Sequence, residues 1–123
     1  MLNRDLLQQK LELKTVVIDV PELGDQATLR MLTAAETNRL HRRANADGVF
    51  DATVFQTLLI AMTLVGEDGS NLFPEEEAPV LAGWPAGVVA RLFLASKRHN
   101  KLGSEEVDEA EKNSPASPSA ASS

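Results

Sequence analysis

The chain of 123 residues suits one small domain, and its hydrophobic fraction of 43% is typical of a globular protein. It contains no cysteine, which excludes disulfides, thiolate metal sites and thiol catalysis. The net charge is −6, but residues 104–123 carry five acidic residues and one lysine, so the remainder is only −2. Broad affinity for nucleic-acid phosphates is therefore not expected.

Two features bear on location. The N-terminal residues MLNRDLLQQK lack the apolar core of a signal peptide. The longest apolar run, around residues 58–65, is shorter than the roughly 20 residues that a membrane span needs. We therefore expect a soluble intracellular protein with no membrane partner.

Residues 1–14 are predicted to form a mobile arm or a short helix. Asn3 can cap a helix in which Leu6, Leu7 and Leu11 lie roughly on one side. Because isolated helices of this length are marginal in water, we expect the arm to order only against a partner.

Two strand patterns follow the arm. TVVIDV, residues 15–20, is rich in β-branched residues, and ATLRML, residues 27–32, alternates apolar and polar side chains. The proline, glycine and aspartate between them predict a β-hairpin over residues 15–32 with a loop of several residues. An isolated hairpin is only marginally stable in water, so this one must pack on helices or pair with another chain.

Capping residues mark the next two helices. Thr33 and Glu36 form a capping-box pattern at the start of a helix expected over residues 34–46. Asp51 can cap a second helix, over residues 51–65. This second helix is apolar on nearly all sides, so we expect it to form the centre of the core.

Two more helices are predicted, and then the composition changes. A short helix over residues 74–82 would place three glutamates at its positive end. A longer helix over residues 86–101 should stop at Gly103. Residues 104–123 are acidic and then rich in Ser, Ala and Pro, so they cannot bury enough apolar area to fold and are predicted to be disordered.

Together these elements predict an α+β fold that is mainly α. An N-terminal β-hairpin packs on a small bundle of three to four helices, and residues 15–103 form a single globular domain. The disordered C-terminal tail follows that domain.

The acidic run GEDGSNLFPEEE, residues 66–77, is the first candidate site. Counting from Asp68, an EF-hand loop would need a glycine and a glutamate where Phe73 and Pro79 stand, so the calcium pattern fails. No apolar pocket is evident that would raise the pKa of a carboxyl for acid–base catalysis. We interpret the run as a turn, with Leu72 and Phe73 folding back into the core.

The remaining chemistry-bearing residues give no catalytic pattern. His41 and His99 lack a metal-ligand spacing and are interpreted as solvated or capping histidines. The basic groups at residues 41–43 and 97–101 have no interleaved stacking aromatics, so solvated helix faces explain them. We therefore expect no catalytic residue, no cofactor, no metal and no nucleic-acid partner.

Trp84, flanked by Gly83 and Pro85, is the only tryptophan. It could anchor an interface, where tryptophan is enriched, or it could plug the core. The core interpretation is favoured, because a lone large ring in a small domain usually packs inside.

Several segments, taken in order, carry a family resemblance. From residue 3 the first of these segments reads NRDLLQQKLELKTVVIDVPELG, and ATLRMLTAAE follows it. Next comes an apolar helix ending in LVGEDGSNLF. The last segment, which ends at residue 113, reads WPAGVVARLFLASKRHNKLGSEEVDEAEKN. In this order and spacing, over about residues 3–113, the chain resembles the tail assembly chaperones of long-tailed (siphovirus-type) bacteriophages. Pro74 departs from the pattern, since a Ser, Thr or Asp cap is typical there, and this blurs the start of the short helix.

The resemblance implies a non-enzymatic role in the host bacterial cytoplasm. Such chaperones bind the tape measure protein, help it to recruit major tail subunits before the tail tube polymerises, and are absent from the finished virion. Many also exist in a longer form made by ribosomal frameshifting, and residues 104–123 would be the place for such a junction. The implied client is then the tape measure protein. Contact with the major tail protein and formation of a homo-oligomer are both left open.

We expect the contact surface to lie on the N-terminal arm, the hairpin edge and the tryptophan loop. The candidate partner-binding residues are Leu6, Leu7, Leu11, Val16, Ile18, Val20 and Trp84. The alternative function is a small phage or bacterial adaptor or regulator with a different client. A nucleic-acid binder would instead show salt-sensitive retention on DNA.

Overall fold

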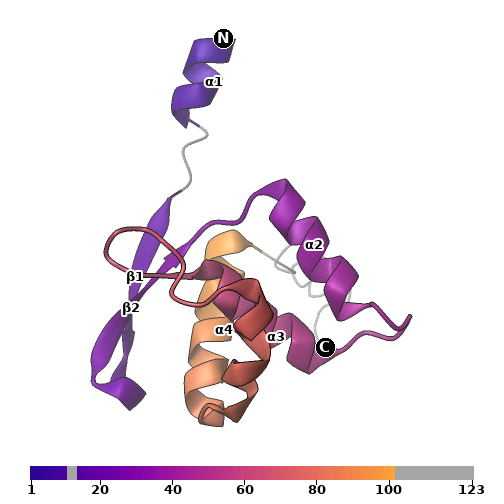
Figure 1. The fold of residues 1–123 in the computed structure, drawn as a ribbon. Coiled ribbons are helices and arrows are strands. Elements are labelled where there is room, and N and C mark those ends of the chain that lie inside the picture. Colours follow the sequence, from indigo (N-terminus) through magenta and orange to yellow (C-terminus); the bar gives the residue numbers. More distant parts are fainter. Residues whose placement is uncertain (11–13, 102–123) are drawn as a thin grey trace, which may run out of the picture.

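The computed structural model describes residues 1–10 and 14–101. In chain order its elements are α1 (Arg4–Lys10), β1 (Thr15–Val20), the 3-10 helix η1 (Pro21–Leu23), β2 (Asp25–Arg30), α2 (Ala34–Ala44), α3 (Ala52–Thr63), β3 (Leu64–Val65), the 3-10 helix η2 (Glu75–Gly83) and α4 (Ala86–Asn100). Figure 1 shows the sheet beside the helices, with α1 standing apart from the other elements. This mainly helical arrangement with an N-terminal antiparallel sheet confirms the predicted fold class. The prediction of disorder for residues 104–123 falls outside the described residues.

The hairpin of β1 and β2 is the predicted one, with a shorter loop. β1 spans the predicted residues, and its Ile18 lies opposite Ala27 in an antiparallel register. β2 begins at Asp25, two residues earlier than expected, because η1 and Gly24 complete the turn between them. Gly24 has φ of 67°, a left-handed conformation that glycine adopts without steric cost.

A third strand was not predicted. Residues 64 and 65 were assigned to the helix over residues 51–65, but the helix ends at Thr63, and Leu64 pairs with Leu29 of β2. The Asn71 side chain donates to the carbonyls of Ala61 and Met62, at 2.9 and 3.0 Å, and so satisfies two of the last acceptors of α3. The chain can therefore leave the helix there and extend the sheet to the order β1-β2-β3.

The N-caps predicted for α2 and α3 are both present. The Thr33 hydroxyl accepts from the Glu36 N–H at 3.2 Å, and the Glu36 carboxylate accepts from the Thr33 N–H at 2.9 Å, which completes the capping box of α2. The Asp51 carboxylate accepts from the Val54 N–H at 3.1 Å at the start of α3. α2 ends at Ala44, two residues before the predicted end.

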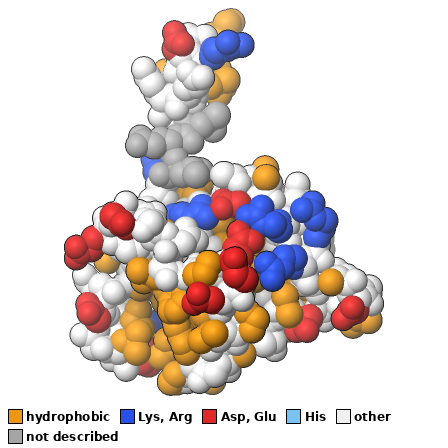
Figure 2. Space-filling view, in the orientation of Figure 1, with side chains coloured by type: hydrophobic (Ala, Val, Ile, Leu, Met, Phe, Trp, Pro, Cys, Tyr) orange, Lys and Arg blue, Asp and Glu red, His pale blue; other side chains and the backbone are white. Residues whose placement is uncertain are grey.

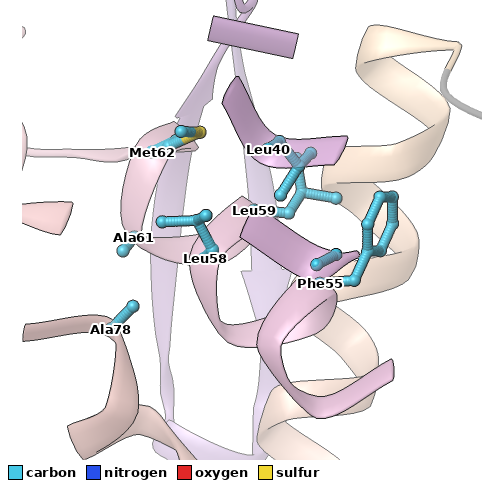
Figure 3. Packing of buried hydrophobic residues seen from close by; sticks show 8 residues of the cluster. Leu40, Phe55, Leu58, Leu59, Ala61, Met62 and Ala78 are labelled. Carbon is cyan, nitrogen blue, oxygen red and sulfur yellow. The ribbon is translucent and has the colours of Figure 1, made fainter. Parts of the chain in front are cut away.

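The centre of the core is α3, as its apolar sequence predicts. Every α3 residue from Phe55 to Thr63 except Gln56 is buried. Leu40 of α2 and Leu59 of α3 point toward each other, and both are fully buried (Figure 3). The Thr63 hydroxyl of α3 shares a buried 2.9 Å hydrogen bond with Ser96 of α4. α3 therefore contacts both α2 and α4.

The predicted short helix over residues 74–82 is the 3-10 helix η2. Pro79 lies inside it, where an α-helix would lose a backbone donor and suffer a steric clash. A 3-10 helix has three residues per turn, so Ala78 and Leu81 fall on one side, and both are buried. Leu72, expected to fold into the core, is instead 55% exposed. Phe73 is half-buried and packs against both clusters of buried residues, a first that contains Leu58 of α3 and a second that contains Leu29 of β2.

α4 follows the prediction closely, with Val88 and Leu92 buried. It ends at Asn100, and Lys101 takes the left-handed cap position with φ of 55°. The Asn100 side chain accepts from the Leu32 N–H at 2.6 Å, which fastens the end of α4 to the chain leaving β2. The predicted stop at Gly103 lies outside the described residues. No helix among the described residues is long and apolar enough to span a membrane.

Candidate protein-binding surface

The short helix α1 carries the first candidate residues. The Asn3 side chain accepts from the Leu6 N–H at 2.9 Å, so the predicted cap is present. None of the residues of α1 is buried; Leu6 is half-buried and Leu7 is 37% exposed. The third predicted leucine, Leu11, lies outside the described residues. α1 therefore presents Leu6 and Leu7 without a core to receive them.

The β1 residues predicted to contact a partner turn their side chains inward instead. Val20 is 1% exposed and belongs to the core cluster around Leu29, Ile60 and Leu92. Val16 and Ile18 are half-buried against the same cluster. Alternate residues of a strand face opposite sides, so the three residues that share the inner face all meet the core. The side chains of Val16, Ile18 and Val20 therefore hold the fold together. β1 leaves its outer backbone edge and its outward side chains, such as Val17 at 57% exposure, for a partner.

The backbone of β1 has a free edge. Among the described strands, β1 is at one end of the sheet order and pairs with β2 alone. The Met31 N–H donates to the Lys14 carbonyl at 3.1 Å, so this opposed pair is a hydrogen-bonded one. Bonded and non-bonded pairs alternate in an antiparallel ladder, so Thr15, Val17 and Asp19 direct their backbone groups away from β2. Unpaired strand edges of this kind accept an added strand from another chain.

A groove of about 480 Å³ runs between this edge and α4. We call it the edge groove and define it by its lining residues, Ile18, Asp19, Gly87, Ala90, Arg91, Leu94, Ala95 and Arg98. Small side chains on α4 leave the space open, and Leu94 within it is 48% exposed.

Polar contacts fix the two ends of the edge groove. At one end Arg91 makes a two-point ion pair with Glu22 of η1, at 2.7 and 2.9 Å. This pairing lowers the pKa of Glu22 below its ordinary value. At the other end a ring nitrogen of His99 lies 3.0 Å from the Lys14 carbonyl. The separation of β1 and α4 is therefore set on both sides of the open stretch.

Trp84 lies on a different groove, of about 360 Å³, between the hairpin and the loop after β3. Its ring packs edge-to-face on Phe73, with centroids 5.4 Å apart, and it is half-buried against the second core cluster. Leu23 and Leu72 line the same groove and are 61% and 55% exposed. Figure 2 shows hydrophobic side chains gathered between the hairpin and the helices on the face in view.

The acidic run forms a turn, as the sequence indicates. The Asp68 carboxylate accepts from both the N–H and the hydroxyl of Ser70, at 3.0 and 2.7 Å, and the Ser70 hydroxyl lowers the pKa of Asp68. Gly69 has φ of 83° at the tip. Among the described residues there is no group of three or more His, Asp or Glu side chains that could hold a metal ion.

A set of ion pairs covers the surface over α2. We call this the ion-pair side; its residues are Arg30, Glu36, Arg39, Arg43 and Glu75. Arg30 bonds the Glu36 carboxylate and lowers its pKa from 4.5 to about 2. Arg39 donates to both oxygens of Glu75, at 2.8 and 2.6 Å, and lowers the pKa of that carboxyl too. Figure 2 shows the basic and acidic side chains together over α2.

Thus the candidate residues fall into two groups. Val16, Ile18, Val20 and Trp84 come together on one core cluster, while Leu6 and Leu7 lie apart on α1. Three exposed leucines beside the grooves, Leu23, Leu72 and Leu94, were not predicted as contacts. Leu94 could have been found from its position off the buried residues Val88 and Leu92 of α4, whereas Leu23 and Leu72 lie in short connecting segments that gave no such signal.

Comparison of the chain with protein-family models, with curated proteins and with solved structures found no match.

Proposed function

We propose that the chain is a tail assembly chaperone of a long-tailed bacteriophage. It binds the tape measure protein in the host bacterial cytoplasm, helps it to recruit major tail subunits, and is absent from the mature virion. The order of its segments supports the family, and one structural observation supports the mode of action: α1, whose leucines meet no core, precedes a strand with a free edge. Both are elements that bind other polypeptides rather than small molecules.

The proposed mechanism is transient masking of an aggregation-prone client. Several copies of the chain cover apolar segments of the tape measure protein and leave when tail tube subunits compete for the same segments. Ordering α1 on the client costs conformational entropy, so the net affinity stays low enough for release.

The client contacts are assigned to two places. Leu6 and Leu7 supply apolar area, and the outward backbone groups of Thr15, Val17 and Asp19 supply hydrogen bonds. The acidic residues act as structural or solvating groups, because the shifts found at Glu22, Glu36, Asp68 and Glu75 all lower the pKa. A general acid for catalysis at neutral pH needs a raised pKa instead.

Co-expression with the tape measure protein of the same phage tests the proposal. The full chain should keep the tape measure protein soluble and co-purify with it. The double variant Leu6→Glu/Leu7→Glu should lower the co-purified amount roughly tenfold, since losing two buried leucines removes more than 1.4 kcal/mol.

The matched control is Gln8→Glu/Gln9→Glu, which adds the same charge to exposed positions of the same helix. It should bind as the unaltered chain does. Deletion of residues 1–20 is unsuitable, because it removes β1 and with it the core residue Val20. An insoluble tape measure protein despite an abundant, folded chain would contradict the proposal and favour an adaptor with another client.

A further inference from the structure

The edge groove is an open site for an extended segment. One wall is the free edge of β1, which offers the backbone groups of Thr15, Val17 and Asp19. The other wall is the stripe of α4 that carries Gly87 and Ala90, whose small size leaves room for another chain. A strand added to β1 would therefore lie along α4 with both of its sides in contact.

Cationic side chains stand along that stripe. Arg91 and Arg98 are seven residues apart, so both fall on the same side of α4, about 10 Å from each other along the helix axis. Arg91 is held by Glu22, whereas Arg98 is exposed and has no ion-pair partner among the described residues. Asp19 is the one acidic residue in the lining. The groove thus favours an extended segment that is acidic near Arg98.

The same chain contains such a segment. Residues 105–111, EEVDEAE, carry five acidic residues and no basic one. They begin four residues after Lys101, whose left-handed conformation turns the chain at the end of α4.

The acidic segment is long enough to follow the groove. Seven extended residues span about 23 Å, more than the distance along α4 from Arg98 to Arg91. A tethered segment of this kind also has an effective concentration of about 1 mM or more at a nearby site, so even weak exposed ion pairs are populated.

We propose that the acidic segment of residues 105–111 occupies the edge groove of its own chain, extended along the free edge of β1 with its carboxylates beside Arg98. The segment then covers the strand edge whenever no other polypeptide holds it. This inference does not depend on the proposed function, because the occupant is part of the same molecule.

Amide hydrogen exchange of the full chain, followed by NMR, tests it. In the comparison variant all five acids of the segment are neutralised: Glu105→Gln, Glu106→Gln, Asp108→Asn, Glu109→Gln and Glu111→Gln. The amides of Thr15, Val17 and Asp19 should exchange roughly tenfold faster in this variant, the factor for an edge that the segment covers about nine-tenths of the time. The Leu59 amide, deep in α3, should exchange at an unchanged rate and so report that the fold is intact.

A control variant neutralises five acids elsewhere on the surface: Asp5→Asn, Asp47→Asn, Glu67→Gln, Glu76→Gln and Glu77→Gln. It makes the same change in net charge and should leave exchange at β1 as it is. Arg98→Glu should speed β1 exchange as much as the neutralised segment does, and should add nothing when combined with it. Arg42→Glu, on α2, is its control.

Equal exchange at Thr15, Val17 and Asp19 in the unaltered chain and the neutralised variant would overturn the proposal. So would equal effects of Arg98→Glu and Arg42→Glu. Neither measurement involves a tape measure protein, so this proposal and the proposed function can fail separately.

Discussion

The arginines of the ion-pair side are bound to carboxylates, whereas Arg98 in the edge groove has no such partner among the described residues. The backbone differs in the same way. On the ion-pair side the start of α2 is capped by Thr33 and Glu36, while the outward backbone groups of β1 along the edge groove face no strand among the described residues. Charge that is already paired holds elements in place, and charge beside an open edge is available to another segment. We therefore propose that the ion-pair side contributes mainly to stability and the edge groove to binding.

The largest expected effect comes from the core beneath the ion-pair side, where α2 packs on α3. Leu40→Ala should lower the free energy of unfolding by about 2–5 kcal/mol, because it leaves a cavity between α2 and α3 beside Leu59. Urea unfolding followed by circular dichroism measures the change. A loss below about 1 kcal/mol would mean that α2 is not part of the cooperative core.

A smaller effect should come from the Arg30–Glu36 pair. Since the pairing lowers the pKa of Glu36 from 4.5 to about 2, the folded chain keeps this carboxyl ionised at a lower pH than the unfolded chain does. The stabilisation is therefore complete at neutral pH, declines as the pH falls through 4.5 toward 2, and is absent below that.

Glu36→Gln should accordingly cost about 2 kcal/mol at pH 7 and almost nothing near pH 2. Urea unfolding at several pH values measures both. The control is Glu22→Gln on the edge groove, where the ion pair with Arg91 is exposed and the pH dependence should be much weaker. A cost of Glu36→Gln that stays constant with pH would show that the carboxylate does not act through its charge.

The smallest effect on stability is expected in the edge groove itself. Leu94→Ala should change the free energy of unfolding by less than about 0.5 kcal/mol, because this side chain is 48% exposed. The same urea assay measures it beside Leu40→Ala. Comparable losses for the two variants would abolish the distinction between the two sides.

Local chemistry explains why much of the fold could be predicted. The β-branched run of β1, the capping pairs of α2 and α3, and the apolar sequence of α3 each act within a few residues. β3 escaped prediction because the apolar run continues through Leu64 and Val65, and the end of α3 is marked only by Asn71, whose side chain caps it from the loop that follows β3. Pro79 was visible in the sequence. The 3-10 helix around it could not be predicted, because that helix depends on packing Ala78 and Leu81 against the rest of the core.

The candidate site was harder to predict for a related reason. The β-branched run of β1 predicted a strand, but it did not show that the helices cover the face that carries Val16, Ile18 and Val20. Val20 was therefore assigned to a partner and lies in the core. The edge groove lies between β1 and α4, which are brought together by a shared core cluster and by the contacts Glu22–Arg91 and Lys14–His99, whose residues are 69 and 85 positions apart in the sequence.

The most direct test of the central claim is hydrogen exchange by mass spectrometry on the complex with the tape measure protein. The chain with its five segment acids neutralised should be used, so that its own acidic segment does not mask the edge. Binding should slow exchange in peptides that cover α1, β1 and α4, and leave those that cover α2 unchanged. Protection of α2 with no change at β1 would contradict the account.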